Sequence, residues 1–476
     1  MVSSRQAAFT EIPGTPPDVM RDYDLATLGY QETEFCVEGI ATSFEQRGER
    51  GADGRWDVSP GAEAPFRTRF VVRRPIEADR FSGTAVVEWN NVSAGIDAGP
   101  DWGFFHRHLT AQGHAWVGVS AQKAGIDGGG LAEGIHLKIL APERYRELEH
   151  PGDAWAFDIF TQVGALLTAS GAENPLSGLV PDSLIAAGES QSAAFLVTYI
   201  NAIDPGARVF DGFFVHGRPG AGVTADGVFI PSGRGTGQES TPLAIAAKGE
   251  RIREDARVPV LVLQSETDLI VLGGRLAAQP DSERIRVWEM AGAAHADTYT
   301  VSAGRHDDGT LEPERLAELL RPTSHLVIGN TDSPINAGPQ QHYVSQAALA
   351  HLTRWAAGDE APPKAPRLAV DAAGTGFRLD KHGLAVGGIR TPWVDAPTAI
   401  MSGLGQGGAG FARLFGRTEP FDDAALSALY PGGKAEYLKR FETALESTIA
   451  AGFILEADRA EILAVAAASY PLLCAG

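Results

Sequence analysis

The residues best suited to chemistry form one short motif, Gly188-Glu189-Ser190-Gln191-Ser192. The mostly apolar residues 183–187 before it predict a strand, and residues 193–200 after it predict a helix. A serine on so sharp a turn projects its hydroxyl away from the sheet, and the amides that open the helix can stabilise a nearby oxyanion. We therefore predict that Ser190 is a nucleophile and that the amide of Gln191 helps to form an oxyanion hole. The alternative is an ordinary turn between a strand and a helix.

A serine nucleophile needs a general base, because its hydroxyl is unreactive at its own pKa. His295 lies on a loop rich in Gly and Ala that follows the predicted strand at residues 284–290, and this context suits a mobile base. The competing histidines are His216, His306, His325 and His342. His295 and Asp297 could also suggest a metal pair, but a third ligand at a supporting spacing is missing. We therefore expect neither a metal nor a cofactor.

The base in turn needs a carboxylate that orients it. Two carboxylates, Glu266 and Asp268, follow the nearly continuous apolar run at residues 258–264, which is typical of a strand buried on both faces. The pattern of strand, small turn and acid favours Asp268, and Glu266 remains the alternative. Both could also be solvated turn residues.

A second oxyanion donor is expected from the loop that follows the predicted strand at residues 84–89. Asn and Gly residues in this loop permit tight backbone geometry, and we predict the amide of Asn91 or of a neighbour as the donor. A plain Asn-rich turn is the alternative. The nearby residues that could line a substrate pocket are Trp89, Asn90 and Trp102.

The composition narrows the class of protein. The chain has 476 residues and a formal net charge of −20, which argues against nucleic acid and anionic membranes as partners. Two cysteines at opposite ends do not suggest a disulfide scaffold. The sequence shows neither an apolar leader at its amino terminus nor a stretch long enough to span a membrane, so we expect a cytoplasmic protein. The oligomeric state cannot be read from the sequence.

Predicted strands alternate with predicted helices through most of the chain, which indicates an α/β fold with a mostly parallel central sheet and helices on both faces. Residues 1–30 are polar and are expected to be irregular, and residues 31–358 form the predicted core. Residues 217–250 are rich in Gly, Pro, Ser and Thr, and either a lid over a pocket or a solvated loop would account for them. Residues 359–476 form a mostly helical C-terminal extension, loop-like over residues 360–420.

These motifs together resemble the α/β-hydrolase superfamily, specifically the long bacterial proteins that contain an alpha/beta hydrolase domain. The matching segments are residues 86–91, 188–192, 264–268, 292–297 and 387–392. The resemblance covers most of residues 30–470 and implies Ser190 as nucleophile, Asp268 or less readily Glu266 as acid, and His295 as base. Two departures stand out: Ser192 replaces the usual Gly, and the chain continues from His295 to residue 476.

The expected activity is hydrolysis of a small carboxylic ester through an acyl-enzyme. An acyltransferase or an amidase would use the same three residues with a different acceptor or substrate. A binding protein that has this fold but no turnover is the alternative from another class, because a fold by itself does not fix an activity.

Overall fold

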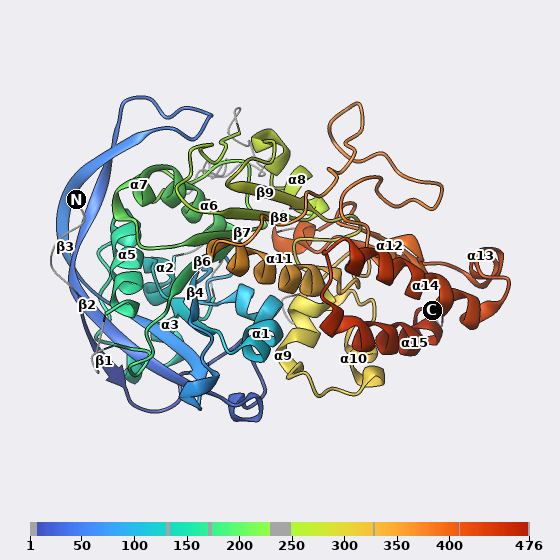
Figure 1. Cartoon of the computed structure of the whole chain (residues 1–476), viewed down its shortest axis with the longest axis horizontal. Coiled ribbons are helices and arrows are strands. Elements are labelled where there is room, and N and C mark those ends of the chain that lie inside the picture. Colours follow the sequence, from blue (N-terminus) through green and yellow to red (C-terminus); the bar gives the residue numbers. More distant parts are fainter. Residues whose placement is uncertain are drawn as a thin grey trace. The chain divides into compact units, whose positions relative to one another are not determined.

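The computed structural model describes residues 7–129, 134–169, 174–228, 249–326, 329–408 and 410–474. Within these ranges, the main sheet has nine strands in the order β1-β2-β3-β5-β4-β6-β7-β8-β9 (Figure 1). Their bounds are β1 Ala8–Ile12, β2 Tyr30–Arg47, β3 Asp57–Pro75, β4 Thr84–Trp89, β5 Ala115–Val119, β6 Ser183–Glu189, β7 Gly212–His216, β8 Val260–Gln264 and β9 Ile285–Glu289.

Antiparallel and parallel pairing occupy different parts of this sheet. Strands β1, β2 and β3 pair antiparallel, and β3 pairs antiparallel with β5. Strand β4 pairs parallel with β5 and β6, and β6 pairs parallel with β7. Every residue of β6 is buried, as expected for a parallel strand that is covered on both faces. β1 also shows that the N-terminal 30 residues are not irregular throughout.

Helices cover both faces of the sheet, and β7 shows this directly. Successive side chains of a strand point to opposite faces. Phe213 contacts Tyr199, which continues helix α6 (Gln191–Thr198), whereas Phe214 contacts Phe105 of helix α1 (Pro100–Gln112). On the α6 face, Trp89 packs against aromatic residues of α6 and of helix α5 (Ala156–Leu167). The predicted α/β fold is confirmed.

The chain divides into two compact units. The first contains Met1–Val262, Leu276–Arg286 and Leu352–Ala361, and the second contains Leu263–Arg275, Val287–His351 and Pro362–Gly476. The sequence predicts a single boundary near residue 358, whereas the contacts place residues 263–275 and 287–351 with the C-terminal segment. The residues that follow β8 and β9 therefore belong to the second unit.

The C-terminal segment is helical at its end, as the sequence predicts. Its helices are α12 (Pro392–Asp395), α13 (Asp423–Leu429), α14 (Gly433–Ala450) and α15 (Arg459–Cys474). Within the predicted loop-like stretch, β12 (Ala399–Ser402) pairs antiparallel with β13 (Arg417–Pro420). Most of the predicted lid, residues 229–248, lies outside the described residues.

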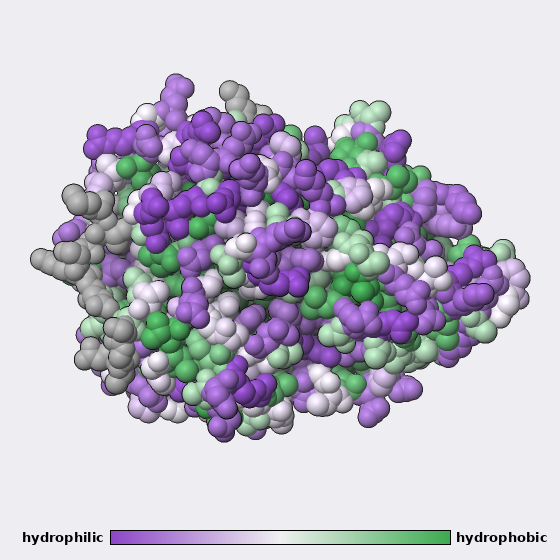
Figure 2. All heavy atoms as spheres, in the orientation of Figure 1, coloured by the Kyte–Doolittle hydropathy of each residue, from purple (hydrophilic) through white to green (hydrophobic). Residues whose placement is uncertain are grey.

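The visible surface is largely hydrophilic (Figure 2). Figure 2 shows hydrophilic residues over much of the visible face, with smaller hydrophobic groups between them. In the part of the chain that the structure describes, we find no helix with the length and apolarity needed to cross a membrane.

Candidate active site

Ser190 lies at the turn between β6 and α6 and has a strained backbone. Its φ is 60° and its ψ is −116°, a combination that costs about 1–3 kcal/mol in a residue with a side chain. Ser190 is half-buried between the buried residues Glu189 and Gln191. A Cβ on Gly188 would lie 3.0 Å from Leu196 Cδ1, so a larger residue there would press against the helix. The turn is therefore tight, and it is strained at the predicted nucleophile.

The amide of Gln191 opens helix α6 and has no hydrogen-bond partner among the described residues. The first amides of a helix lack partners within the helix and can bind an anion. The side chain of Gln191 is fixed: its Nε2 donates to Gln122 Oε1 over 3.0 Å, and Trp89 Nε1 donates to the same oxygen over 3.1 Å. This network holds the first residue of the helix in place.

The loop after β4 does not leave the Asn91 amide available as the second oxyanion donor. The Asn91 amide donates to Ala98 O over 2.7 Å, so it is already used inside the loop. The side chain of Asn91 instead reaches the turn, since Nδ2 donates to Glu189 O over 2.9 Å. The next amide, that of Val92, has no hydrogen-bond partner among the described residues. Val92 therefore replaces Asn91 as the candidate donor from this loop.

The three predicted pocket residues have different surroundings. Trp89 is fully buried in aromatic packing, and Trp102 is buried with its Nε1 donating to Tyr23 Oη. Asn90 lines a hollow that is also lined by Arg69 and Arg73. Trp89 and Trp102 are therefore packing residues, and Asn90 alone faces a cavity.

His295 and Asp268 are brought together in the second unit. His295 Nδ1 and Asp268 Oδ1 are 2.6 Å apart, and the side chains are 6% and 1% exposed. Asp268 lies in the first turn of the short helix α8 (Glu266–Ile270), and its Oδ2 accepts from Ser265 N over 2.6 Å. Asp268 Oδ2 thus fixes the turn, while Asp268 Oδ1 is hydrogen-bonded to His295.

Glu266, the alternative acid, has other partners. Its Oε1 accepts from Gly292 N over 2.6 Å, and its Oε2 accepts from Ser402 Oγ and Gly403 N, both over 2.9 Å. Burial raises the pKa of Glu266, and these three donors act in the opposite direction by stabilising the charged form. Asp268, and not Glu266, is the carboxylate hydrogen-bonded to His295 Nδ1.

Among the competing histidines, His216 also has a carboxylate partner. Its Nδ1 lies 2.8 Å from Asp101 Oδ1, and both side chains are almost fully buried in the first unit. Burial raises the pKa of Asp101 well above its ordinary value, and the nearby Glu189 adds to the rise. Sequence reasoning missed this pair, because Asp101 begins a helix far from His216 in the chain and nothing in its spacing points to His216.

Of the remaining histidines, His342 is buried and stacks on Tyr299, with 4.0 Å between the ring centroids. His306 lies in the short helix α9 (Gly304–His306), and His325 is exposed. The described residues contain no group of three or more His, Cys, Asp or Glu arranged to hold a metal ion.

Residues 3–464 match the sequence model of the alpha/beta hydrolase domain family, so the chain belongs to this family. No curated protein matches the chain.

Solved structures with which the chain can be aligned include an esterase from Rhizomucor miehei, with 14% identity, 55% of this chain and 78% of that chain covered, and a TM-score of 0.30. A dienelactone hydrolase from Anabaena variabilis shows 12% identity, 47% and 80% coverage and a TM-score of 0.26. An esterase from Pyrococcus furiosus shows 8% identity, 58% and 87% coverage and a TM-score of 0.27. Similarities this low carry no argument about activity.

Proposed function

We propose that this protein is a serine hydrolase that cleaves a carboxylic ester, with Ser190 as nucleophile, His295 as base and Asp268 as acid. The observation that carries the proposal is the strained backbone of Ser190 between β6 and α6, since such strain is maintained where the surrounding structure and function require it. Two further observations support it: the hydrogen bond between His295 and Asp268, and membership of the hydrolase family.

In the proposed first step, Ser190 Oγ attacks the ester carbonyl carbon while His295 Nε2 accepts its proton. Asp268 holds the Nδ1–H tautomer of the imidazole and stabilises the imidazolium. The amides of Gln191 and Val92 are the proposed donors to the tetrahedral oxyanion. When the intermediate collapses, the bond from carbon to the ester oxygen breaks, and His295 gives its proton to the departing alcohol.

In the second step, His295 accepts a proton from water, whose oxygen attacks the acyl carbon bound to Ser190. Collapse of the second tetrahedral intermediate releases the carboxylic acid and returns the proton to Ser190. The reaction needs only the ester and water.

The test uses wild type and Ser190→Ala with a fluorophosphonate probe, and turnover of p-nitrophenyl acetate in parallel. We expect labelling and turnover in wild type and loss of both in the variant, with the thermal unfolding temperature largely retained. Labelling that persists in Ser190→Ala would place the nucleophile elsewhere. A folded wild type that is neither labelled nor active would favour a non-catalytic binding protein. Product analysis with an added alcohol separates hydrolysis from acyl transfer.

A further inference from the structure

Two loops of the second unit carry the proposed acid and base, and both meet the end of β12. We call residues 265–268, which include the first turn of α8, the acid loop, and residues 291–297 the histidine loop. Glu266 Oε2 accepts from Ser402 Oγ and from Gly403 N, each over 2.9 Å. Thr267 Oγ1 donates to Gly403 O over 2.6 Å. Two consecutive residues late in the chain therefore bind the two residues that immediately precede Asp268.

The same acid-loop residues also bind the histidine loop. Glu266 Oε1 accepts from Gly292 N over 2.6 Å, and Thr267 Oγ1 accepts from His295 N over 3.2 Å. Glu266 thus joins Gly292 of one loop to Ser402 and Gly403 of the C-terminal segment. Because its three hydrogen-bond partners all donate, they favour the carboxylate form.

Gly403 is also packed closely against both loops. A Cβ on Gly403 would lie 2.4 Å from Ala293 O, 2.7 Å from Glu266 Cβ and 2.7 Å from Thr267 N. Real side chains do not approach backbone atoms so closely, so Gly403 leaves no room for any other residue. Its backbone lies against both loops, and a larger residue would have to push at least one of them away.

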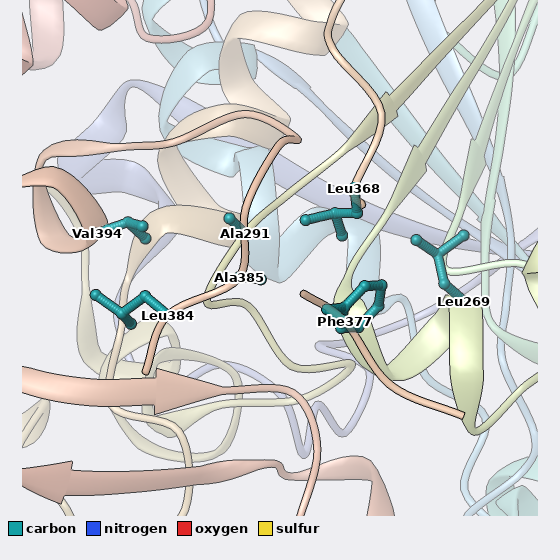
Figure 3. Packing of buried hydrophobic residues seen from close by; sticks show 7 residues of the cluster. All are labelled: Leu269, Ala291, Leu368, Phe377, Leu384, Ala385 and Val394. Carbon is teal, nitrogen blue, oxygen red and sulfur yellow. The ribbon is translucent and has the colours of Figure 1, made fainter. Parts of the chain in front are cut away.

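Apolar packing continues this contact on the other side of Asp268. Leu269, the next residue, and Ala291, at the start of the histidine loop, belong to one buried cluster (Figure 3). The other members all come from the C-terminal segment: Leu368, Phe377, Leu384, Ala385 and Val394. Removing such a cluster from water stabilises the local arrangement of both loops as well as the fold.

We infer that Glu266, Ser402 and Gly403 are positioning residues for Asp268 and His295, so that the C-terminal segment is part of the catalytic apparatus. This inference rests on the proposed function. It assigns a role to the long continuation of the chain beyond His295. It also gives Glu266 a role different from that of the triad acid.

The main test removes and then restores one hydroxyl. Ser402→Ala deletes a donor to Glu266, and Ser402→Thr keeps that donor. Ser447→Ala is the matched control, because the Ser447 hydroxyl is exposed and donates to Thr443 O within its own helix, α14. For each variant, kcat and KM for p-nitrophenyl acetate are measured. The value of kcat is calculated from the concentration of protein that the fluorophosphonate labels at end point, which corrects for any unfolded fraction.

We expect Ser402→Ala to lower kcat/KM per labelled site by about tenfold, mainly through kcat, since small displacements of a catalytic group slow the chemical step. Ser402→Thr is expected to recover activity to within about twofold of wild type. Glu266→Gln is expected to lose more than Ser402→Ala, because its amide places a donor against the donating groups that surround Glu266.

Two outcomes would overturn the inference without contradicting the proposed function. In the first, Ser402→Ala and Glu266→Gln keep wild-type kcat/KM per labelled site while Ser190→Ala is inactive; the proposed function would then stand without the positioning role. In the second, Ser402→Thr or Ser447→Ala loses as much as Ser402→Ala, which would show a general structural effect. If Ser190→Ala keeps its labelling, the proposed function fails, and the inference fails with it.

Discussion

Ser190 is positioned by its own strand and helix, whereas His295 and Asp268 are held by residues from the far end of the chain. The turn at Ser190 is set by a buried parallel strand, a close helix and a strained backbone, all within residues 183–198. The acid and histidine loops instead depend on Ser402, Gly403 and a cluster built largely from C-terminal residues. A local sequence motif can thus position the proposed nucleophile, whereas its proposed partners require support from distant residues.

The largest effect is expected for His295, and a matched variant of His216 tests whether the right histidine has been chosen. His295→Asn removes the proposed base and is expected to lower kcat/KM by at least about 10⁴-fold. His216→Asn is expected to cost less than about tenfold per labelled site, although it destabilises the first unit by leaving a cavity. Steady-state kinetics combined with thermal unfolding separates these effects. The reverse ranking of activities would make His216 the base and Asp101 its acid.

The next largest effect concerns the acid. Asp268→Asn keeps the size of the side chain but favours the wrong imidazole tautomer, so we expect a loss of about 10³–10⁴-fold in kcat. Glu266→Gln serves as the comparison and should cost much less. If Glu266→Gln costs more than Asp268→Asn, Glu266 rather than Asp268 is the more important acid.

A smaller effect is expected on the nucleophile side. Asn91→Ala removes the hydrogen bonds that join the loop after β4 to Glu189, and so loosens the proposed amide of Val92. We expect a loss of about tenfold in kcat, less than the cost of deleting an oxyanion donor outright. Ser93→Ala, on the same loop, is the control and should have little effect. Equal kinetics for the two variants would contradict a role for this loop in oxyanion binding.

The smallest effect on activity, but a measurable one on stability, is expected for His108 in the first unit. Burial lowers the pKa of His108 to about 3, and the nearby His114 and Arg354 contribute. In the unfolded chain, where the pKa of a histidine is near 6.5, His108 binds a proton below that pH, whereas in the native state it stays neutral. The free energy of unfolding therefore falls as the pH drops from about 6.5 towards 3. His108→Phe should reduce the loss of unfolding free energy between pH 8 and pH 5 by about 2 kcal/mol.

Urea unfolding at the two pH values measures this difference. His325→Gln, which changes an exposed histidine, is the control and should leave the pH dependence unchanged. A pH dependence of His108→Phe that equals that of wild type would show that His108 does not contribute to acid sensitivity.

Local sequence patterns were enough to predict the alternation of strands and helices, the turn at Ser190 and the two segments that contain His295 and Asp268. These features arise from short-range patterns: buried strands give apolar runs, and a tight turn needs small residues on both sides. The helices at the end of the C-terminal segment were readable for the same reason, because helical periodicity extends over several turns.

The hydrogen bonds of the remaining polar groups depend on contacts that form in the folded chain. The Asn91 amide is occupied by Ala98, Trp89 and Trp102 serve packing, and Glu266 binds Ser402 and Gly403. The choice between Glu266 and Asp268 as the partner of His295 also depends on three-dimensional contacts. Hydrogen-bond partners far apart in the chain leave no spacing pattern, so these assignments follow from how the folded chain packs and not from any local motif.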